Sequence, residues 1–140
     1  MAALIGLDIG DKRVGVAICS AGSFLAVPLT ILERAQGRAE DAIVKLVTEH
    51  QAQTIVVGLP LDEAGNPTPQ SKKIENFCRR LARRVDSKLV YVDEYASSEE
   101  SREQLAQTRG RSALRARVDS YAATLILQSY LDSMGQAGER

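Results

Sequence analysis

Residues 3–9 form a nearly continuous apolar run that is interrupted by one carboxylate, Asp8. Such a run is typical of a strand covered on both faces, since a strand with one face in water alternates apolar and polar residues. We therefore expect a sheet with helices on both sides. A carboxylate inside this strand loses solvation unless a cation or several hydrogen-bond donors compensate it. Asp8 accordingly predicts a metal or phosphate site.

Composition limits the classes of protein that this chain can belong to. With 140 residues and 44% hydrophobic residues, it is expected to form one soluble domain over residues 1–140. Its 18 basic and 18 acidic side chains cancel, so binding to nucleic acid would depend on local clusters of charge. We find no signal peptide or membrane span and expect a cytoplasmic protein with no membrane partner. Cys19 and Cys78 lack metal-type spacing and are expected to be buried thiols.

Strand and helix patterns alternate along the chain in a way that predicts the α/β class. Three strand-like segments come first, and the short turns between them favour an antiparallel meander. They cover Ala3–Ile9, Val14–Ser20 and Leu25–Leu32. Further segments are a helix at Ala39–His50, a strand at Thr54–Gly58, a helix opened by Pro69, a strand at Leu89–Val92, a helix from Ser97 to Gln107, and a helix at Val118–Met134. This order predicts a five-stranded mixed sheet flanked by about four helices. Right-handed crossovers leave few topologies, and one of them places the first strand between the second and fourth.

Three carboxylates are expected to meet at one edge of this sheet. Ligands of open α/β sheets bind at the carboxyl ends of the parallel strands, where Asp8 lies near the end of the first strand. Glu94 follows the last strand, and Asp119 lies at the start of the last helix. Oxygen ligands suit Mg²⁺ or Mn²⁺, and a site of this kind suits phosphodiester hydrolysis. Two alternatives stay open: Asp93 could point inward in place of Glu94, and Asp119 could be a helix cap.

Several segments together resemble the YqgF family of RuvC-like proteins with a ribonuclease H fold. The resemblance covers essentially the whole chain and rests on residues 6–17, 55–61, 92–94, 118–123 and 126–131. Members of this family are described as nucleases that process the 5′ end of pre-16S ribosomal RNA and as Holliday junction resolvases. The resemblance implies that Asp8, Glu94 and Asp119 are catalytic carboxylates that bind metal. It also implies phosphate contacts from Lys12 and Arg13.

Two positions depart from the family pattern. The family usually has arginine and then paired threonines after its Asp-Glu pair, whereas this chain has Tyr95 and then Ala96, Ser97 and Ser98. Tyr95 can supply at most one neutral hydrogen bond where an arginine would contact phosphate, so the affinity or the preferred substrate can differ. Asp11 stands where a small hydroxyl residue is usual, and it is either a helper ligand or a turn former.

Basic residues cluster most densely just before Asp119. Arg109, Arg111, Arg115 and Arg117 lie in a segment that contains no acidic residue, which is suited to clamping a phosphate backbone. A second group, Arg79, Arg80, Arg83 and Arg84, is interpreted as the solvated face of a helix. The few aromatic residues favour recognition of backbone shape over base stacking.

These patterns favour the hypothesis that the chain is a metal-dependent endonuclease of pre-16S ribosomal RNA. Ribosomal particles would then be expected partners of the protein. Resolution of a four-way DNA junction is an alternative that needs a homodimer, for which the apolar last helix is a candidate interface. An alternative from another class of protein is an actin-like ATP-binding protein or sugar kinase. The length of the chain argues against this alternative. A further alternative is a non-catalytic RNA-binding maturation factor.

Overall fold

The computed structural model describes the backbone of residues 2–93 and 111–138, and the side chains of residues 2–93 and 121–134. The elements are β1 (Leu4–Ile9), β2 (Arg13–Cys19), β3 (Val27–Glu33), a 3-10 turn η1 (Ala35–Gly37), α1 (Arg38–His50), β4 (Thr54–Leu59), α2 (Pro69–Ala82), β5 (Lys88–Asp93) and α4 (Arg111–Gly138). The strands form one sheet in the order β3-β2-β1-β4-β5. The prediction of a mixed sheet with the first strand between the second and fourth is confirmed.

Strand direction determines which ends of the strands meet. β1 pairs antiparallel with β2, and β2 pairs antiparallel with β3. β4 runs parallel to both β1 and β5, so these three strands end at the same edge of the sheet. The parallel ladder between β1 and β4 extends only from Leu4 to Leu7, whereas the ladder with β2 continues to Ile9. The end of β1 is therefore paired on one side only.

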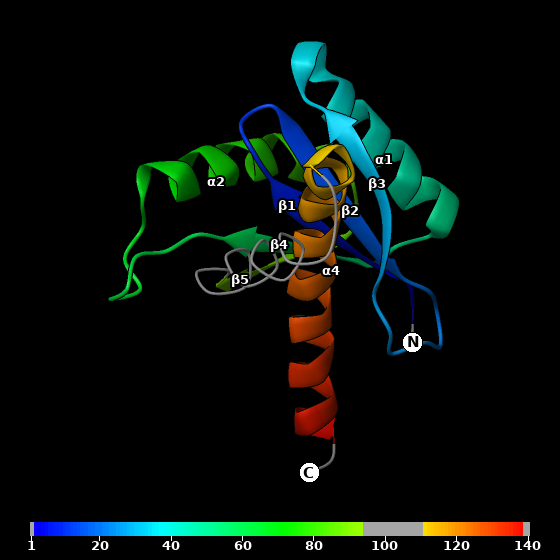
Figure 1. Ribbon diagram of the computed structural model, residues 1–140. Helices are drawn as coiled ribbons and strands as arrows, with labels where there is room; N and C mark the ends of the chain where they lie inside the picture. Colours follow the sequence, from blue (N-terminus) through cyan, green and yellow to red (C-terminus); the bar gives the residue numbers. More distant parts are fainter. Residues whose placement is uncertain (1, 94–110, 139–140) are drawn as a thin grey trace.

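Helices cover both faces of the sheet, as the apolar run in β1 predicts. Figure 1 shows α4 across one face, with α1 and α2 on the other. Side chains of β1 alternate between two cores: Ile5, Leu7 and Ile9 pack with α1 and α2, while Leu4 packs in the cluster that contains α4 residues. Cys19 belongs to the α4 cluster and Cys78 to the other. Both thiols are free and buried, as expected, and the sheet separates them.

The two helices on the same face are joined through charged side chains. Pro69 opens α2, and Thr68 and Ser71 form a capping box in which each side chain accepts a hydrogen bond from the other backbone N–H. On the outer surface, Arg80 pairs with Glu40 at 3.5 Å, and Arg84 pairs with Asp41 at 2.9 Å. The interpretation of the α2 arginines as a solvated face is supported, and two of them also connect α2 to α1.

Two boundaries differ from the prediction. α4 begins at Arg111, well before the expected Val118, because residues 111–117 are mostly strong helix formers and contain no glycine or proline. The third strand begins at Val27 rather than Leu25, which leaves Phe24 and Leu25 exposed in the turn before it. The helix expected from Ser97 to Gln107 lies outside the described residues. Among the residues that the structure describes, no helix has both the length and the apolar character needed to cross a bilayer.

Candidate active site

Asp8 lies at the carboxyl edge of the central strand. It pairs with Gly15 of β2 and is half-buried, in contrast to the fully buried apolar residues on both sides of it. Side chains alternate along a strand, so Asp8 is on the same face as Leu4 and Gly6, which is the face covered by α4. The carboxylate has an interaction within the protein. A half-buried carboxylate at an open edge can be reached by a ligand from solvent.

Gly6 brings α4 unusually close to β1. A Cβ added at Gly6 would lie 2.7 Å from Cβ of Leu127 and 3.0 Å from the carbonyl oxygen of Ala123. The helix therefore crosses the strand at Gly6, and only glycine leaves room for it. The small side chains of Ala122 and Ala123 are buried at this contact.

This crossing point also places the backbone at position 119. Figure 1 shows that α4 runs antiparallel to β1, starting near the edge where β1 ends. Asp8 lies two residues beyond Gly6, a rise of about 6.6 Å along a strand. Position 119 lies four residues before Ala123, a rise of about 6 Å along the same face of a helix. This spacing predicts that position 119 lies on the face of α4 turned toward the sheet, near the level of Asp8, and the side chain of Asp119 is outside those described.

The interpretation of Asp119 as a helix cap is wrong. α4 starts at Arg111, so Asp119 lies more than two turns inside the helix, where no backbone N–H is left for a cap to bind. The expectation that Asp119 begins the last helix is corrected for the same reason. A carboxylate at this position therefore cannot cap the start of the helix.

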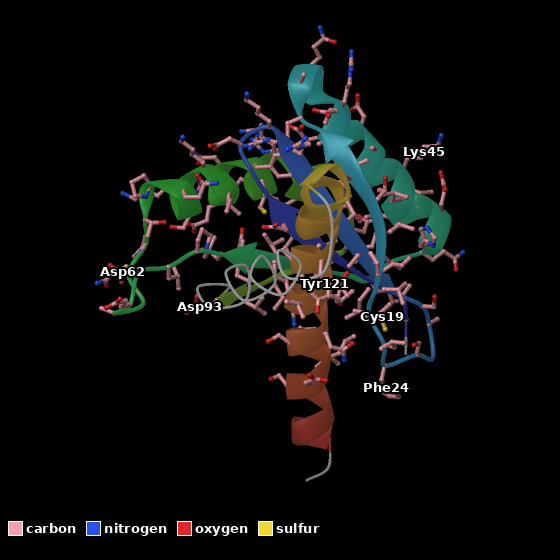
Figure 2. The ribbon with its side chains drawn as sticks, in the orientation of Figure 1. Cys19, Phe24, Lys45, Asp62, Asp93 and Tyr121 are labelled. Atoms are coloured by element: carbon pink, nitrogen blue, oxygen red, sulfur yellow. The ribbon has the colours of Figure 1, made fainter. Side chains whose placement is uncertain are left out.

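Asp93 faces away from Asp8. Leu89 packs against the core that contains α1 and α2, and Val92 packs against the core that contains α4, which places Tyr91 on the face opposite to α4. Asp93 lies two residues further along β5 and shares that face, and it is exposed. Figure 2 shows Asp93 at the end of β5, with Tyr121 on α4. Asp93 is therefore not the inward-pointing partner of Asp8, and the other candidate, Glu94, lies outside the described residues.

The β1–β2 turn carries the basic residues expected to contact phosphate. The Gly10 N–H donates to the Arg13 carbonyl at 2.8 Å, which closes the turn. Lys12 is exposed, and Arg13 is half-buried on the same face of the sheet as Gly15 and Asp8. Asp11 is exposed in the turn. A cavity of about 440 Å³ opens next to it and is lined by Asp11, Lys12, Glu33, Arg34 and Ala35.

Several predicted site residues cannot be placed from the structure. Glu94, Tyr95 and Arg109 lie outside the described residues, and for Arg111, Arg115 and Arg117 only the backbone, within α4, is described. Among the side chains that the structure describes, no three histidine, cysteine, aspartate or glutamate residues gather into a metal site. The described side chains include Asp8 but neither Glu94 nor Asp119.

Sequence reasoning missed the contribution of Gly6 and Arg34. Gly6 could have been suspected because it is a lone small residue in the apolar run of β1. Arg34 contacts the β1–β2 turn across the sheet edge: its Nη1 donates to the Gly10 carbonyl at 2.6 Å. Its only signal in the sequence is that it lies two residues after the strand expected at Leu25–Leu32.

Comparison with known proteins assigns the family. The family model RuvX, described as Holliday junction resolvase, matches residues 2–133. The chain belongs to the RuvX family. This confirms the resemblance to YqgF, which is the same family.

Relatives of this RuvX chain include a protein of Gloeothece citriformis that is 42% identical over 132 residues, which cover 93% of this chain and 87% of that protein. A relative from Synechocystis is 39% identical with the same coverage. Both carry the name "Putative pre-16S rRNA nuclease". Among solved structures, Thermus thermophilus RuvC in complex with a Holliday junction substrate has a TM-score of 0.58 at 12% identity, with 96% of each chain covered. A second Thermus thermophilus RuvC structure has a TM-score of 0.57 at 13% identity. These likenesses confirm the expected ribonuclease H-like fold.

Proposed function

We propose that this RuvX chain is a metal-dependent nuclease that cuts structured nucleic acid, with pre-16S ribosomal RNA as its substrate. The observation that carries the proposal is the half-buried carboxylate of Asp8 at the carboxyl edge of the sheet, on the face that α4 covers. Membership of the RuvX family supports a nuclease over an ATP-binding protein. The names of the relatives support the ribosomal substrate over a DNA junction.

The chemistry of the proposed ligands fits a hard divalent ion. Asp8 offers carboxylate oxygens at a place that is partly open to solvent, and Glu94 and Asp119 would add further oxygens. Mg²⁺ and Mn²⁺ prefer such ligands. When bound, the ion would polarise the phosphate and favour an attacking water. The proposed metal site needs no histidine or cysteine ligand. Cys19 and Cys78 are buried in the two cores.

Basic residues would hold the substrate backbone against this edge. Lys12 and Arg13 lie in the turn that directly follows Asp8, so phosphates bound there would be placed close to the carboxylate. The arginines of residues 109–117 would extend this contact along the strand of nucleic acid. Phosphate contacts of this kind give affinity that falls with salt and depends little on sequence.

Cleavage assays with one variant and one matched control test the proposal. The protein is incubated with a pre-16S RNA fragment or a four-way DNA junction, with Mg²⁺, Mn²⁺ or a chelator. Asp8→Asn should slow cutting at least ~100-fold, because loss of a metal ligand removes several kcal/mol of transition-state stabilisation, and should leave RNA binding nearly intact. Asp93→Asn changes an exposed carboxylate on the opposite face and should cut normally.

Four outcomes would count against parts of this proposal. Cutting that persists in chelator would contradict the metal dependence. Normal cutting by Asp8→Asn would remove Asp8 from the site. Faster cutting of the DNA junction than of the RNA would replace the substrate with a branched DNA and would require a dimer with two matched sites. Binding of RNA without any cutting would support a non-catalytic maturation factor.

A further inference from the structure

Arg34 holds the turn that follows Asp8 with two of its donors. Its backbone N–H donates to the carbonyl of Lys12 at 2.9 Å, and its side-chain Nη1 donates to the carbonyl of Gly10 at 2.6 Å. Arg34 comes directly after β3, which is separated from β1 by β2. One residue thus ties the end of the third strand to both ends of the β1–β2 turn.

The guanidinium of Arg34 also packs over an aromatic ring. Its Cζ lies 5.0 Å from the centre of the Phe77 ring, and Phe77 is fully buried in α2. A cation over an aromatic face is attracted to it, and the contact limits the conformations of a long side chain. Arg80 lies over the same ring at 5.9 Å and pairs with Glu40, but it is not among the residues that bind the turn.

The end of β1 depends on this support more than the rest of the strand does. Beyond Leu7, β1 has no ladder with β4 within the described residues, so the backbone at Asp8 and Ile9 is paired on the β2 side. That ladder is closed at the turn by one hydrogen bond, from Gly10 to Arg13. Arg34 adds its two bonds at that turn, between Asp8 on one side and Lys12 on the other.

We propose that Arg34 is a positioning residue of the nuclease site, which fixes the β1–β2 turn and thereby sets the placement of Asp8 and Lys12. This inference rests on the proposed function. Arg34 would not bind substrate; it acts through the two backbone carbonyls that it contacts. A displacement of about 1 Å in a reacting group can lower a rate about 100-fold, so loss of this hold should reduce turnover.

Three variants separate positioning from general stability. Arg34→Met keeps a long side chain and the backbone N–H that donates to Lys12, but removes the side-chain donor to the Gly10 carbonyl. Arg34→Lys restores the charge and one side-chain donor group. Arg80→Met is the matched control, because it removes the other cation over Phe77 and leaves the turn untouched. Amide hydrogen exchange of the peptide covering residues 8–13, urea unfolding and cleavage kinetics are measured for all three.

The expected result is specific to the turn. Arg34→Met should speed exchange at Gly10 and its neighbours by about tenfold or more over Arg80→Met, since hydrogen bonds to a charged donor are lost. Its kcat should fall ~10–100-fold, and Arg34→Lys should recover part of that loss. Equal exchange in Arg34→Met and Arg80→Met would overturn the inference, as would faster exchange with an unchanged kcat. If the unmodified protein does not cut, the proposed function fails, whereas the exchange rates still decide whether Arg34 holds the turn.

Discussion

Gly6→Ala is the sharpest test of the close packing between α4 and the sheet. The new Cβ would lie 2.7 Å from Cβ of Leu127 and 3.0 Å from the Ala123 carbonyl oxygen, whereas carbon atoms normally approach to about 3.5–4.0 Å. Neither neighbouring atom can move by a change of rotamer, so the helix backbone has to shift by about 1 Å. Overpacking typically costs about 1–3 kcal/mol, and rigid neighbours favour the upper end of that range.

Alanine also favours a strand over glycine by about 0.5–1 kcal/mol, which offsets part of this cost. We therefore expect a net loss of about 2 kcal/mol in the free energy of unfolding. For 140 residues with an unfolding entropy of about 2.1 cal/mol/K per residue, this lowers Tm by about 7 °C. Urea and thermal unfolding followed by circular dichroism measure both quantities.

Gly22→Ala is the control for this experiment. No atom lies within 4 Å of a Cβ at Gly22, and its φ of +82° gives a backbone strain of about 1 kcal/mol that does not involve α4. Gly6→Ala should also reduce cleavage, because position 119 moves with the helix, and Gly22→Ala should not. An unchanged urea midpoint for Gly6→Ala would refute the reasoning.

Two further predictions concern other buried contacts. Burial raises the pKa of the Cys78 thiol from 9.0 to about 11, against a lowering by the hydrogen bond from Tyr91, and burial likewise raises the pKa of Tyr91 to about 12. The folded state holds these protons more tightly than the unfolded chain does, so the free energy of unfolding should be at its full value below pH 9 and fall between pH 9 and 12. Urea unfolding across this pH range measures the fall, and Cys78→Ala should make it smaller. The Gln128 side chain accepts from the Ala26 N–H at 2.9 Å and donates to the Phe24 carbonyl at 3.1 Å. Gln128→Ala should cost about 1–2 kcal/mol and speed hydrogen exchange at residues 24–26, and protection equal to that of the unmodified protein would contradict this.

Hydrophobic pattern was sufficient to predict most of the fold. The apolar run around Asp8 predicted a central strand covered on both faces. The spacing of Ile74, Phe77 and Leu81 is typical of a helix with one buried face, and all three are buried in α2. These predictions succeeded because burial imposes a period on the sequence. The beginning of α4 was missed because residues 111–117 are rich in arginine and have no apolar stripe to mark a helix.

The candidate site was less predictable because its geometry depends on contacts between distant residues. Asp8 stood out as a charge among apolar neighbours, but the role of Gly6 depends on a helix more than 100 positions away. Arg34 reaches a carbonyl 24 residues away, and no local pattern encodes that contact. The choice against Asp93 likewise required the packing of Leu89 and Val92 against opposite cores, which identifies the faces of β5.

The crossing of α4 over Gly6 restricts where this chain can gain or lose residues. An α-helix turns about 100° and rises about 1.5 Å per residue, so one residue inserted between positions 119 and 123 would carry position 119 around the helix and away from Asp8. The same insertion after residue 134 would leave the relation between the two positions unchanged. Working relatives of this chain can therefore vary in length at the end of α4, but the interval from 119 to 123 has to keep its length even where its side chains differ.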